Sequence, residues 1–130
     1  LITVTPSKKP VFDGSKCKKG ITISCVGAYK PDMQEMDPAI LTRASKIFFD
    51  SKSAVLEESG DILKPLAEGI ITEEDITGEI GDVLGGKLKG REREDEIIVF
   101  ETVGIGLQDL ITAKTIYEKA VAQDVGSQWE

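Results

Sequence analysis

The chain has 130 residues, of which 40% are hydrophobic and 30% are charged, the composition of one ordinary globular domain with a moderate core. Its formal net charge of −7 argues against a nucleic-acid partner, because nucleic-acid binding depends on a basic surface that neutralises phosphates. Every apolar run is far shorter than the roughly 20 residues that cross a bilayer, so no membrane partner is expected.

Four strands are predicted, at residues 1–5, 21–26, 46–50 and 96–100. Each is a short apolar segment rich in β-branched or aromatic side chains and bounded by turn residues. The near-continuous apolar character of the second strand is typical of a parallel sheet that is covered on both faces. The first strand begins at Leu1 without a polar lead-in, which suggests a protein that extends upstream.

Four helices are predicted between and after these strands, at residues 38–44, 51–60, 72–85 and from 107 onward. Asp37 and Pro38 form a typical helix start, and Gly60 is expected to end the second helix. The last helix is expected to be well buried, because it carries an apolar face at helical spacing. That face consists of Leu107, Leu110, Ile111, Tyr117 and Val121. Strands that alternate with helices predict an α/β domain with a doubly wound parallel sheet.

The chain contains no histidine, which excludes the Ser-His-Asp and Cys-His types of nucleophilic catalysis and argues against most zinc sites. Cys17 and Cys25 have neither a metal-ligand spacing nor the pattern of a disulfide framework. We therefore expect no metal site and a reduced, cytoplasmic compartment. Cys25 lies in an apolar run and is expected to be a small buried hydrophobe.

Ligands of open α/β sheets bind beyond the carboxyl ends of the strands. The loops to inspect are therefore 5–7, 27–32, 50–51 and 102–106. In the last of these, Gly104-Ile105-Gly106 is interpreted as a tight strand-to-helix turn, because the third glycine and the ribose-reading carboxylate of a phosphate loop do not follow it.

Most acidic residues are interpreted as structural or solvated. Asp37 is expected to act as a helix cap, with Asp32 and Glu35 solvated beside it. Exposed faces are expected at Glu57, Glu58, Glu92, Glu94, Asp95 and Glu96. Tyr29, just beyond the second strand, is left open between a loop-packing aromatic and a site residue.

A set of short stretches matches, in order, the pattern of one protein family. They include Thr3-Val4-Thr5, Val26-Gly27-Ala28, Pro31-Asp32, Glu35-Met36-Asp37, Asp50-Ser51, Gly60-Asp61, Gly78-Glu79-Ile80-Gly81, Gly90-Arg91, Val103-Gly104 and Ala113-Lys114. From residue 1 to about 119, the chain resembles the ornithine cyclodeaminase/mu-crystallin family.

The resemblance implies that residues 1–106 are the C-terminal part of a Rossmann-type domain for NAD or NADP. The N-terminal half of that domain, with the glycine-rich phosphate loop and the residue that distinguishes NAD from NADP, would lie upstream. Residues 107–130 would form a C-terminal helix that packs on the dimerisation domain of a homodimer. Without the phosphate loop, this chain alone is expected to be inactive and to bind dinucleotide poorly.

The resemblance also implies which residues meet the cofactor. Thr3, Val4 and Thr5 would lie along the dinucleotide. Val26, Gly27 and Ala28 would approach its nicotinamide end, and Val103 and Gly104 would flank the nicotinamide.

Tyr29 stands where the ornithine cyclodeaminases of this family have a catalytic aspartate. That departure favours an NAD(P)-dependent oxidoreductase of a small amino or imino acid, of the ketimine reductase or amino-acid dehydrogenase type. An ornithine cyclodeaminase-type lyase and a non-catalytic, mu-crystallin-like dinucleotide-binding protein are the alternatives. The substrate itself is left open.

Overall fold

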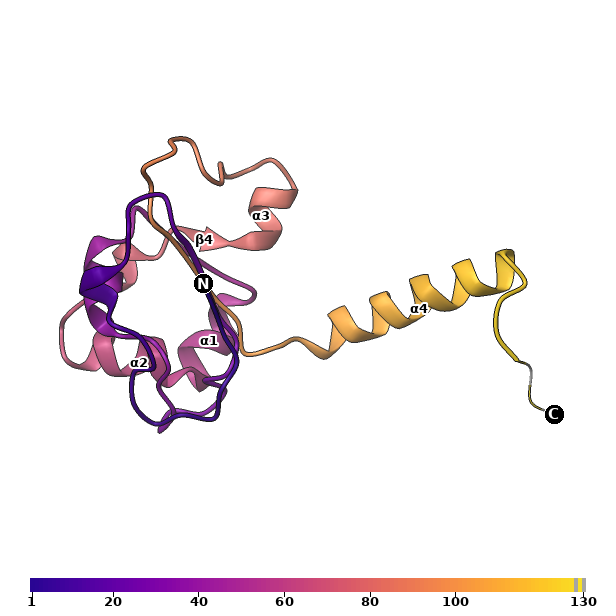
Figure 1. Ribbon diagram of the computed structural model, residues 1–130, viewed down its shortest axis with the longest axis horizontal. Helices are drawn as coiled ribbons and strands as arrows, with labels where there is room; N and C mark the ends of the chain where they lie inside the picture. The colour runs from indigo at the N-terminus through magenta and orange to yellow at the C-terminus, as the bar shows by residue number, and fades with distance from the viewer. Residues whose placement is uncertain (128, 130) are drawn as a thin grey trace.

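The computed structural model describes residues 1–127 and 129, and it consists of a rounded α/β unit from which one long helix projects (Figure 1). The unit is built on a parallel sheet of five strands in the order β1-β2-β5-β3-β4. The strands are β1 (Ile2–Thr3), β2 (Thr22–Cys25), β3 (Lys46–Phe49), β4 (Gly78–Glu79) and β5 (Ile98–Glu101). The parallel sheet confirms the predicted fold class.

The register of the sheet aligns the carboxyl ends of all its strands. Thr3 pairs with Cys25, and Cys25 pairs with Glu101. Glu101 also pairs with Phe49, which in turn pairs with Glu79. The loops that leave the strands therefore emerge along one edge of the sheet, the edge formed by the carboxyl ends of its strands. Ligands of parallel α/β sheets bind there.

The core lies between the sheet and the helices that follow β2 and β3. Wholly or nearly wholly buried side chains fill it, including Ile23, Ile40, Ile47, Val55, Ile62 and Val99. Cys25 is completely buried among them, as predicted for a small hydrophobe. Because apolar surface removed from water contributes about 25 cal/mol per Å², this layer is the main source of the unit's stability.

The helix after β2 follows the sequence prediction closely. It is a 3-10 helix, η2 (Pro38–Arg43), and Asp37 Oδ1 accepts a hydrogen bond from the backbone N–H of Ala39 at 3.0 Å. Its C-terminal residue Arg43 donates to the carbonyl oxygen of Cys17 at 2.7 Å. That carbonyl lies just beyond a further 3-10 turn, η1 (Gly14–Lys16), so Arg43 links the two turns.

The predicted end of the next helix was wrong. Helix α1 (Lys52–Glu58) follows its N-cap Ser51, where the helix was predicted to begin, but Gly60 begins a second helix, α2 (Gly60–Ala67). A Cβ atom at Gly60 would lie 2.0 Å from the carbonyl oxygen of Met33. Glycine is required here for close approach to the 31–33 loop and not as a helix end.

The single helix predicted over 72–85 was also wrong. That segment forms η3 (Glu73–Asp75), the short strand β4 and then α3 (Ile80–Leu84). Thr77 donates its backbone N–H to Ile47 O at 2.8 Å, and Ile47 N–H donates to Thr77 Oγ1 at 3.0 Å. Hydrogen bonds to β3 hold this segment as a strand. The helical spacing of its apolar residues does not reveal that pairing.

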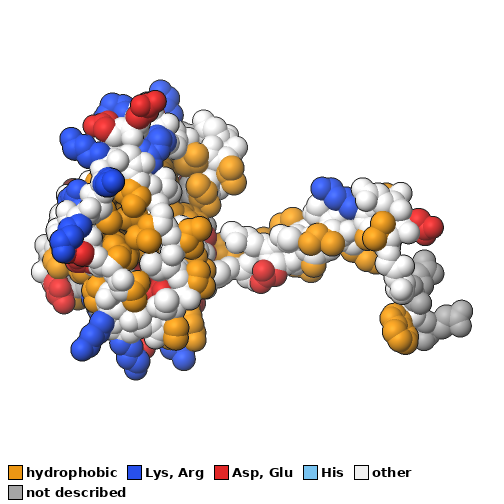
Figure 2. Space-filling model, viewed as in Figure 1, with side chains coloured by type: hydrophobic (Ala, Val, Ile, Leu, Met, Phe, Trp, Pro, Cys, Tyr) orange, Lys and Arg blue, Asp and Glu red, His pale blue; other side chains and the backbone are white. Residues whose placement is uncertain are grey.

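The last helix, α4 (Gly106–Ala122), is not buried as expected. No residue of α4 is buried, and Leu110 and Tyr117 are 66% and 70% exposed. The helix extends away from the α/β unit, with hydrophobic side chains along it (Figures 1 and 2). The periodicity identified the helix and its apolar face, but no other described element packs on that face. None of the helices of the described residues is long and apolar enough to span a membrane.

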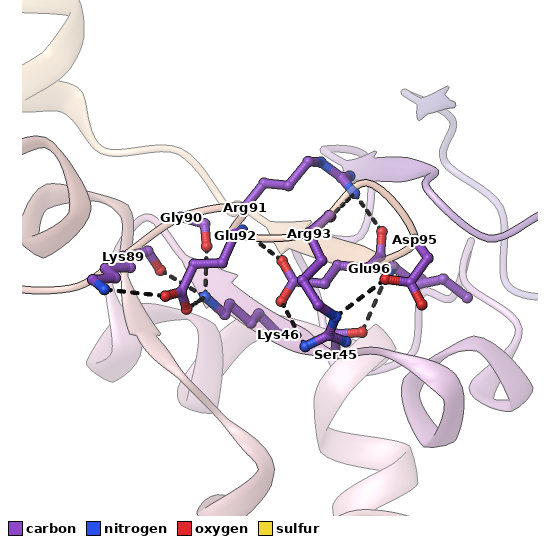
Figure 3. A network of polar contacts seen from close by, with 10 residues as sticks. Ser45, Lys46, Lys89, Gly90, Arg91, Glu92, Arg93, Asp95 and Glu96 are labelled. Atoms are coloured by element: carbon purple, nitrogen blue, oxygen red, sulfur yellow. Dashed lines mark hydrogen bonds and ion pairs between the residues drawn. The ribbon is translucent and has the colours of Figure 1, made fainter.

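The charged segment before β5 is held by a network at the amino ends of the strands (Figure 3). Lys46, the first residue of β3, lies 2.6 Å from Glu92 Oε2 and donates to the carbonyl oxygen of Gly90 at 2.6 Å. Glu96 accepts a hydrogen bond from the backbone N–H of Glu92 at 2.8 Å and is only 3% exposed. The prediction that Glu96 lies on an exposed face was therefore wrong. Its buried carboxylate binds the backbone of the loop that this network holds against the sheet.

Candidate functional site

Three loops continue side by side beyond the carboxyl ends of β1, β2 and β5. Val26 N–H donates to Thr3 O at 3.0 Å, and Thr102 N–H donates to Cys25 O at 3.1 Å. The structure thus brings the residues expected at the cofactor to one edge of the sheet. Among them Val4, Val26 and Gly104 are exposed, Thr5 and Val103 are half-buried, and Thr3, Gly27 and Ala28 are buried.

Gly27 marks a close approach between the loops after β1 and β2. A Cβ atom at this position would lie 2.2 Å from Thr5 O and 2.5 Å from Thr5 N. Real Cβ atoms do not come so close to backbone atoms, so a side chain here would force the two loops apart. The backbone of this edge is consequently built around a glycine.

Glu35 joins the same two loops from beneath. Its carboxylate accepts a hydrogen bond from Thr3 Oγ1 at 3.1 Å and one from the backbone N–H of Gly27 at 2.7 Å. It also accepts the backbone N–H of Thr5. Glu35 is completely buried, so the expectation of a solvated carboxylate was wrong. The nearby Met33 and Met36 are buried too, and their apolar side chains were a local sequence signal of an inward-facing segment.

Asp61, near the start of α2, supports Glu35 through the backbone. Asp61 Oδ1 accepts the N–H of Glu35 at 2.7 Å and the N–H of Met36 at 2.8 Å. Burial raises the pKa of the Asp61 carboxyl to about 6. Its other oxygen, Oδ2, has no hydrogen-bond partner among the described residues, which favours the protonated form.

Glu101 and Cys25 lie beside Asp61, and their ligand atoms fall within 4.8 Å of one another. Ser59 Oγ donates to Glu101 Oε1 at 2.7 Å, while Glu101 Oε2 has no partner among the described residues. Burial and the neighbouring Asp61 raise the pKa of Glu101, and burial raises that of the Cys25 thiol. Metal ligands must be deprotonated, so these raised pKa values weaken the cluster as a metal site.

Asp50 performs a similar linking role between β3 and β5. Its Oδ2 accepts the backbone N–H of Gly104 at 3.1 Å and the hydroxyl of Thr102. Gly104 has a φ of +86°, a left-handed conformation that favours glycine. The Gly104-Ile105-Gly106 segment is thus the tight turn into α4 that its pattern predicts.

Tyr29 extends from the loop after β2 into solvent. Its side chain is 47% exposed, and its backbone N–H donates to Gly27 O at 3.2 Å. Lys30 Nζ lies 5.5 Å from the centre of the Tyr29 ring. A hollow of about 510 Å³, lined in part by Leu41, Ser45 and Thr77, lies instead near the start of β3. This hollow lies at the amino ends of the strands, whereas Tyr29 lies beyond their carboxyl ends. The two do not mark the same site.

The chain that forms this edge matches a known protein family. The model of the ornithine cyclodeaminase/mu-crystallin family matches residues 1–124. The chain belongs to that family. The match covers both the strand-end loops and α4, and it confirms the resemblance found in the sequence.

Among its relatives is a Delta(1)-pyrroline-2-carboxylate reductase from Bacillus cereus, 42% identical over 130 residues. That alignment covers all of this chain and 40% of the relative. A solved structure of the Thermococcus litoralis Delta(1)-pyrroline-2-carboxylate reductase in complex with NADH and L-proline is 40% identical, with a TM-score of 0.89. It covers 99% of this chain, which spans 40% of it.

An archaeal alanine dehydrogenase dimer with bound NAD is similar as well, at 38% identity and a TM-score of 0.84. The match covers all of this chain and 40% of the dehydrogenase chain. The chain thus spans about 40% of the length of the proteins that it matches.

Proposed function

We propose that this chain is part of an NAD(P)-dependent oxidoreductase that reduces a small imino acid. The observation that carries the proposal is the edge formed by the loops after β1, β2 and β5, in a chain so similar to a reductase structure with NADH and L-proline. Such an enzyme would use residues 1–106 as the C-terminal part of its dinucleotide-binding domain, with the remainder of the domain supplied by other sequence.

The exposed residues of this edge suit the nicotinamide end of a dinucleotide. The dinucleotide, when bound, supplies the hydride. Val4 and Val26, 67% and 38% exposed, would contact it with apolar surface. Thr3, Thr5, Gly27 and Ala28 would shape the backbone beneath it, and Val103 would border it. A Cβ atom at Gly104 meets nothing within 4 Å, so this turn has open space for a ring to approach.

The substrate side of the proposal rests on Tyr29. Its exposed phenol offers one hydrogen-bond donor and acceptor where the family's cyclodeaminases have an aspartate. A phenol supplies no carboxylate at this position, which favours imine reduction over a lyase reaction. We assign Tyr29 to the substrate pocket.

We also propose that the full protein is a cytoplasmic homodimer. The similar alanine dehydrogenase is a dimer, and α4 presents an apolar face that a dimerisation domain would cover. Cys17 and Cys25 are both free thiols, which fits a reduced compartment.

The test is an assay of the full-length protein with Delta(1)-pyrroline-2-carboxylate and NADH or NADPH. The expected result is oxidation of the nicotinamide with formation of an equal amount of proline. Release of ammonia from ornithine without net change in NADH would instead identify a lyase. Tight dinucleotide binding with no turnover of any amino or imino acid would identify a binding protein.

Two matched variants locate the dinucleotide on this chain. Val26→Asp places a charge at the proposed nicotinamide edge, whereas Ile70→Asp places it at the opposite edge of the sheet. The two side chains are almost equally exposed, at 38% and 37%. We expect Val26→Asp to weaken NADH binding by about tenfold or more and Ile70→Asp to leave it unchanged. Equal effects would contradict the placement.

A further inference from the structure

We propose that Glu35 is a positioning residue, which sets the spacing of the loops after β1 and β2 and thereby the fit of the dinucleotide. This inference rests on the proposed function, because those loops are the ones assigned to the cofactor. It concerns a residue that contacts the loops from the buried side and need not touch the ligand.

The hydrogen bonds of Glu35 connect two segments that are far apart in the sequence. Thr3, the last residue of β1, donates through Oγ1 at 3.1 Å, and Thr5, in the loop after β1, donates its backbone N–H. The backbone N–H of Gly27, at 2.7 Å, comes from the loop after β2. One side chain thus serves as the common acceptor of both loops, and each loop's position depends on it.

The backbone N–H groups of Thr5 and Gly27 have no acceptor other than Glu35 among the described residues. Gly27 brings no side chain to this contact, and its backbone lies against that of Thr5. Loss of the carboxylate would leave the buried N–H of Gly27 and the half-buried N–H of Thr5 unpaired, and such groups are costly to remove from water. The loops would move to recover partners.

Glu35 is itself held on both sides. Asp61 Oδ1 accepts its backbone N–H at 2.7 Å, and its carbonyl oxygen accepts the N–H of Val11 at 2.8 Å. The side chain is completely buried. A fixed backbone and a buried carboxylate with three donors leave Glu35 a single orientation, as a positioning role requires.

The residues next to the donors are the outward-facing ones. Val4 lies between Thr3 and Thr5, and Val26 precedes Gly27, and both valines are exposed at the edge of the sheet. A displacement of either loop therefore moves a proposed cofactor contact directly. The expected consequence is weaker dinucleotide binding, with a smaller effect on the imine, because only the loop after β2 also carries Tyr29.

The test is Glu35→Gln in the full-length protein. Glutamine keeps the size of the side chain. Its amide NH2, however, must face one of the groups that donate hydrogen bonds to the Glu35 carboxylate, where it cannot act as the acceptor. We expect the Kd for NADH, from fluorescence titration of the folded protein, to rise about tenfold, equivalent to about 1.4 kcal/mol. The KM for the imine should rise less than the Kd for NADH, because both loops carry proposed cofactor contacts and only one carries Tyr29. A general loss of stability would not produce that split.

Two further variants complete the design. Glu58→Gln is the control, since Glu58 is an exposed carboxylate on α1, and it should leave both constants unchanged. Thr3→Val removes one donor and keeps both backbone hydrogen bonds, so it should raise the Kd by about threefold. It should add much less in the Glu35→Gln background, because the two side chains share one interaction.

The outcomes separate the two proposals. A wild-type protein that neither binds NADH nor reduces the imine overturns the proposed function and this inference with it. An active wild type whose Glu35→Gln variant keeps the same Kd overturns only the role of Glu35. If Glu35→Gln does not fold, Thr3→Val decides, and an unchanged Kd in that variant overturns the inference.

Discussion

The buried carboxyl groups behind the sheet edge differ in how their oxygens are satisfied. Both carboxylate oxygens of Glu35 accept hydrogen bonds, so its burial is compensated. Asp61 and Glu101 each keep one oxygen without a partner among the described residues. A buried oxygen without a donor is costly when charged, which makes these two groups the places where pH should act on stability.

We predict that Asp61→Asn removes part of a pH-dependent cost. The pKa of Asp61 is raised from 3.8 to about 6, so the folded state binds its proton more tightly than the unfolded state. Stability contributed by this proton is complete below about pH 4 and is lost as the pH rises through about 6. The variant should therefore gain up to about 3 kcal/mol relative to wild type between about pH 4 and pH 7.

Urea unfolding at a series of pH values measures this difference. The introduced asparagine would keep the Oδ1 acceptor for Glu35 and Met36 and add a donor where Oδ2 now has no partner. Asp32→Asn is the control, because Asp32 is exposed and Lys8 lowers the pKa of its carboxyl. A constant difference between Asp61→Asn and wild type would show that the pKa of Asp61 is not raised.

A second prediction at the residue scale compares two ion pairs of equal length. Lys46 Nζ and Lys8 Nζ each lie 2.6 Å from a carboxylate oxygen, but the two lysine side chains are 14% and 68% exposed. Lys46 also donates to Gly90 O. We expect Lys46→Met to lower the free energy of unfolding by about 1–3 kcal/mol and Lys8→Met to leave it unchanged. Equal losses would mean that burial does not decide the strength of these pairs.

Individual residues were predictable where the cause is local. The Asp37 cap follows from the Asp-Pro pair, and the burial of Cys25 follows from its apolar neighbours. The role of Glu35 does not, because its donors lie on loops 8 to 32 residues away in the sequence. Glu101 was missed since the predicted strand ended at Phe100, one residue before it.

At the scale of elements, β1, β2, β3 and β5 were found because β-branched and aromatic residues mark them. The short strand β4 was not found. Its segment becomes a strand because it pairs with β3, and its own residues have no marked strand preference. The boundary at Gly60 failed for a related reason. Glycine marks a helix end and a close backbone approach equally well, and only the position of Met33 distinguishes them.

We predict that α4 contributes little to the stability of the α/β unit. A chain truncated after Ile105 should keep the free energy of urea unfolding within about 0.5 kcal/mol of the whole chain, because no residue of α4 is buried. The truncated chain should also associate less with itself in sedimentation experiments, since it lacks the exposed apolar face. A large loss of stability would show that α4 packs on the unit.

At the scale of the whole molecule, the strand order places the proposed cofactor loops beside the outer strand β1. In the described residues β1 has one neighbouring strand, β2. In the proposed enzyme the strands that bear the phosphate loop would extend the sheet from here. This chain would then supply the nicotinamide side of the cleft, and the remaining sequence would supply the phosphate side.

That division predicts how the chain behaves alone. Dinucleotide affinity in Rossmann-type domains depends on a glycine-rich turn and a helix N-terminus that bind the pyrophosphate, and the chain has no matching glycine pattern. We expect the 130-residue chain to bind NADH at least about 100-fold more weakly than the full-length protein, a difference of about 2.7 kcal/mol. Isothermal titration calorimetry on both proteins measures it, with intact masses determined first to establish which chain is present. Equal affinities would place the phosphate-binding groups within these 130 residues. They would overturn the proposal that this chain supplies only the nicotinamide side of the dinucleotide site and the remaining sequence supplies the phosphate side.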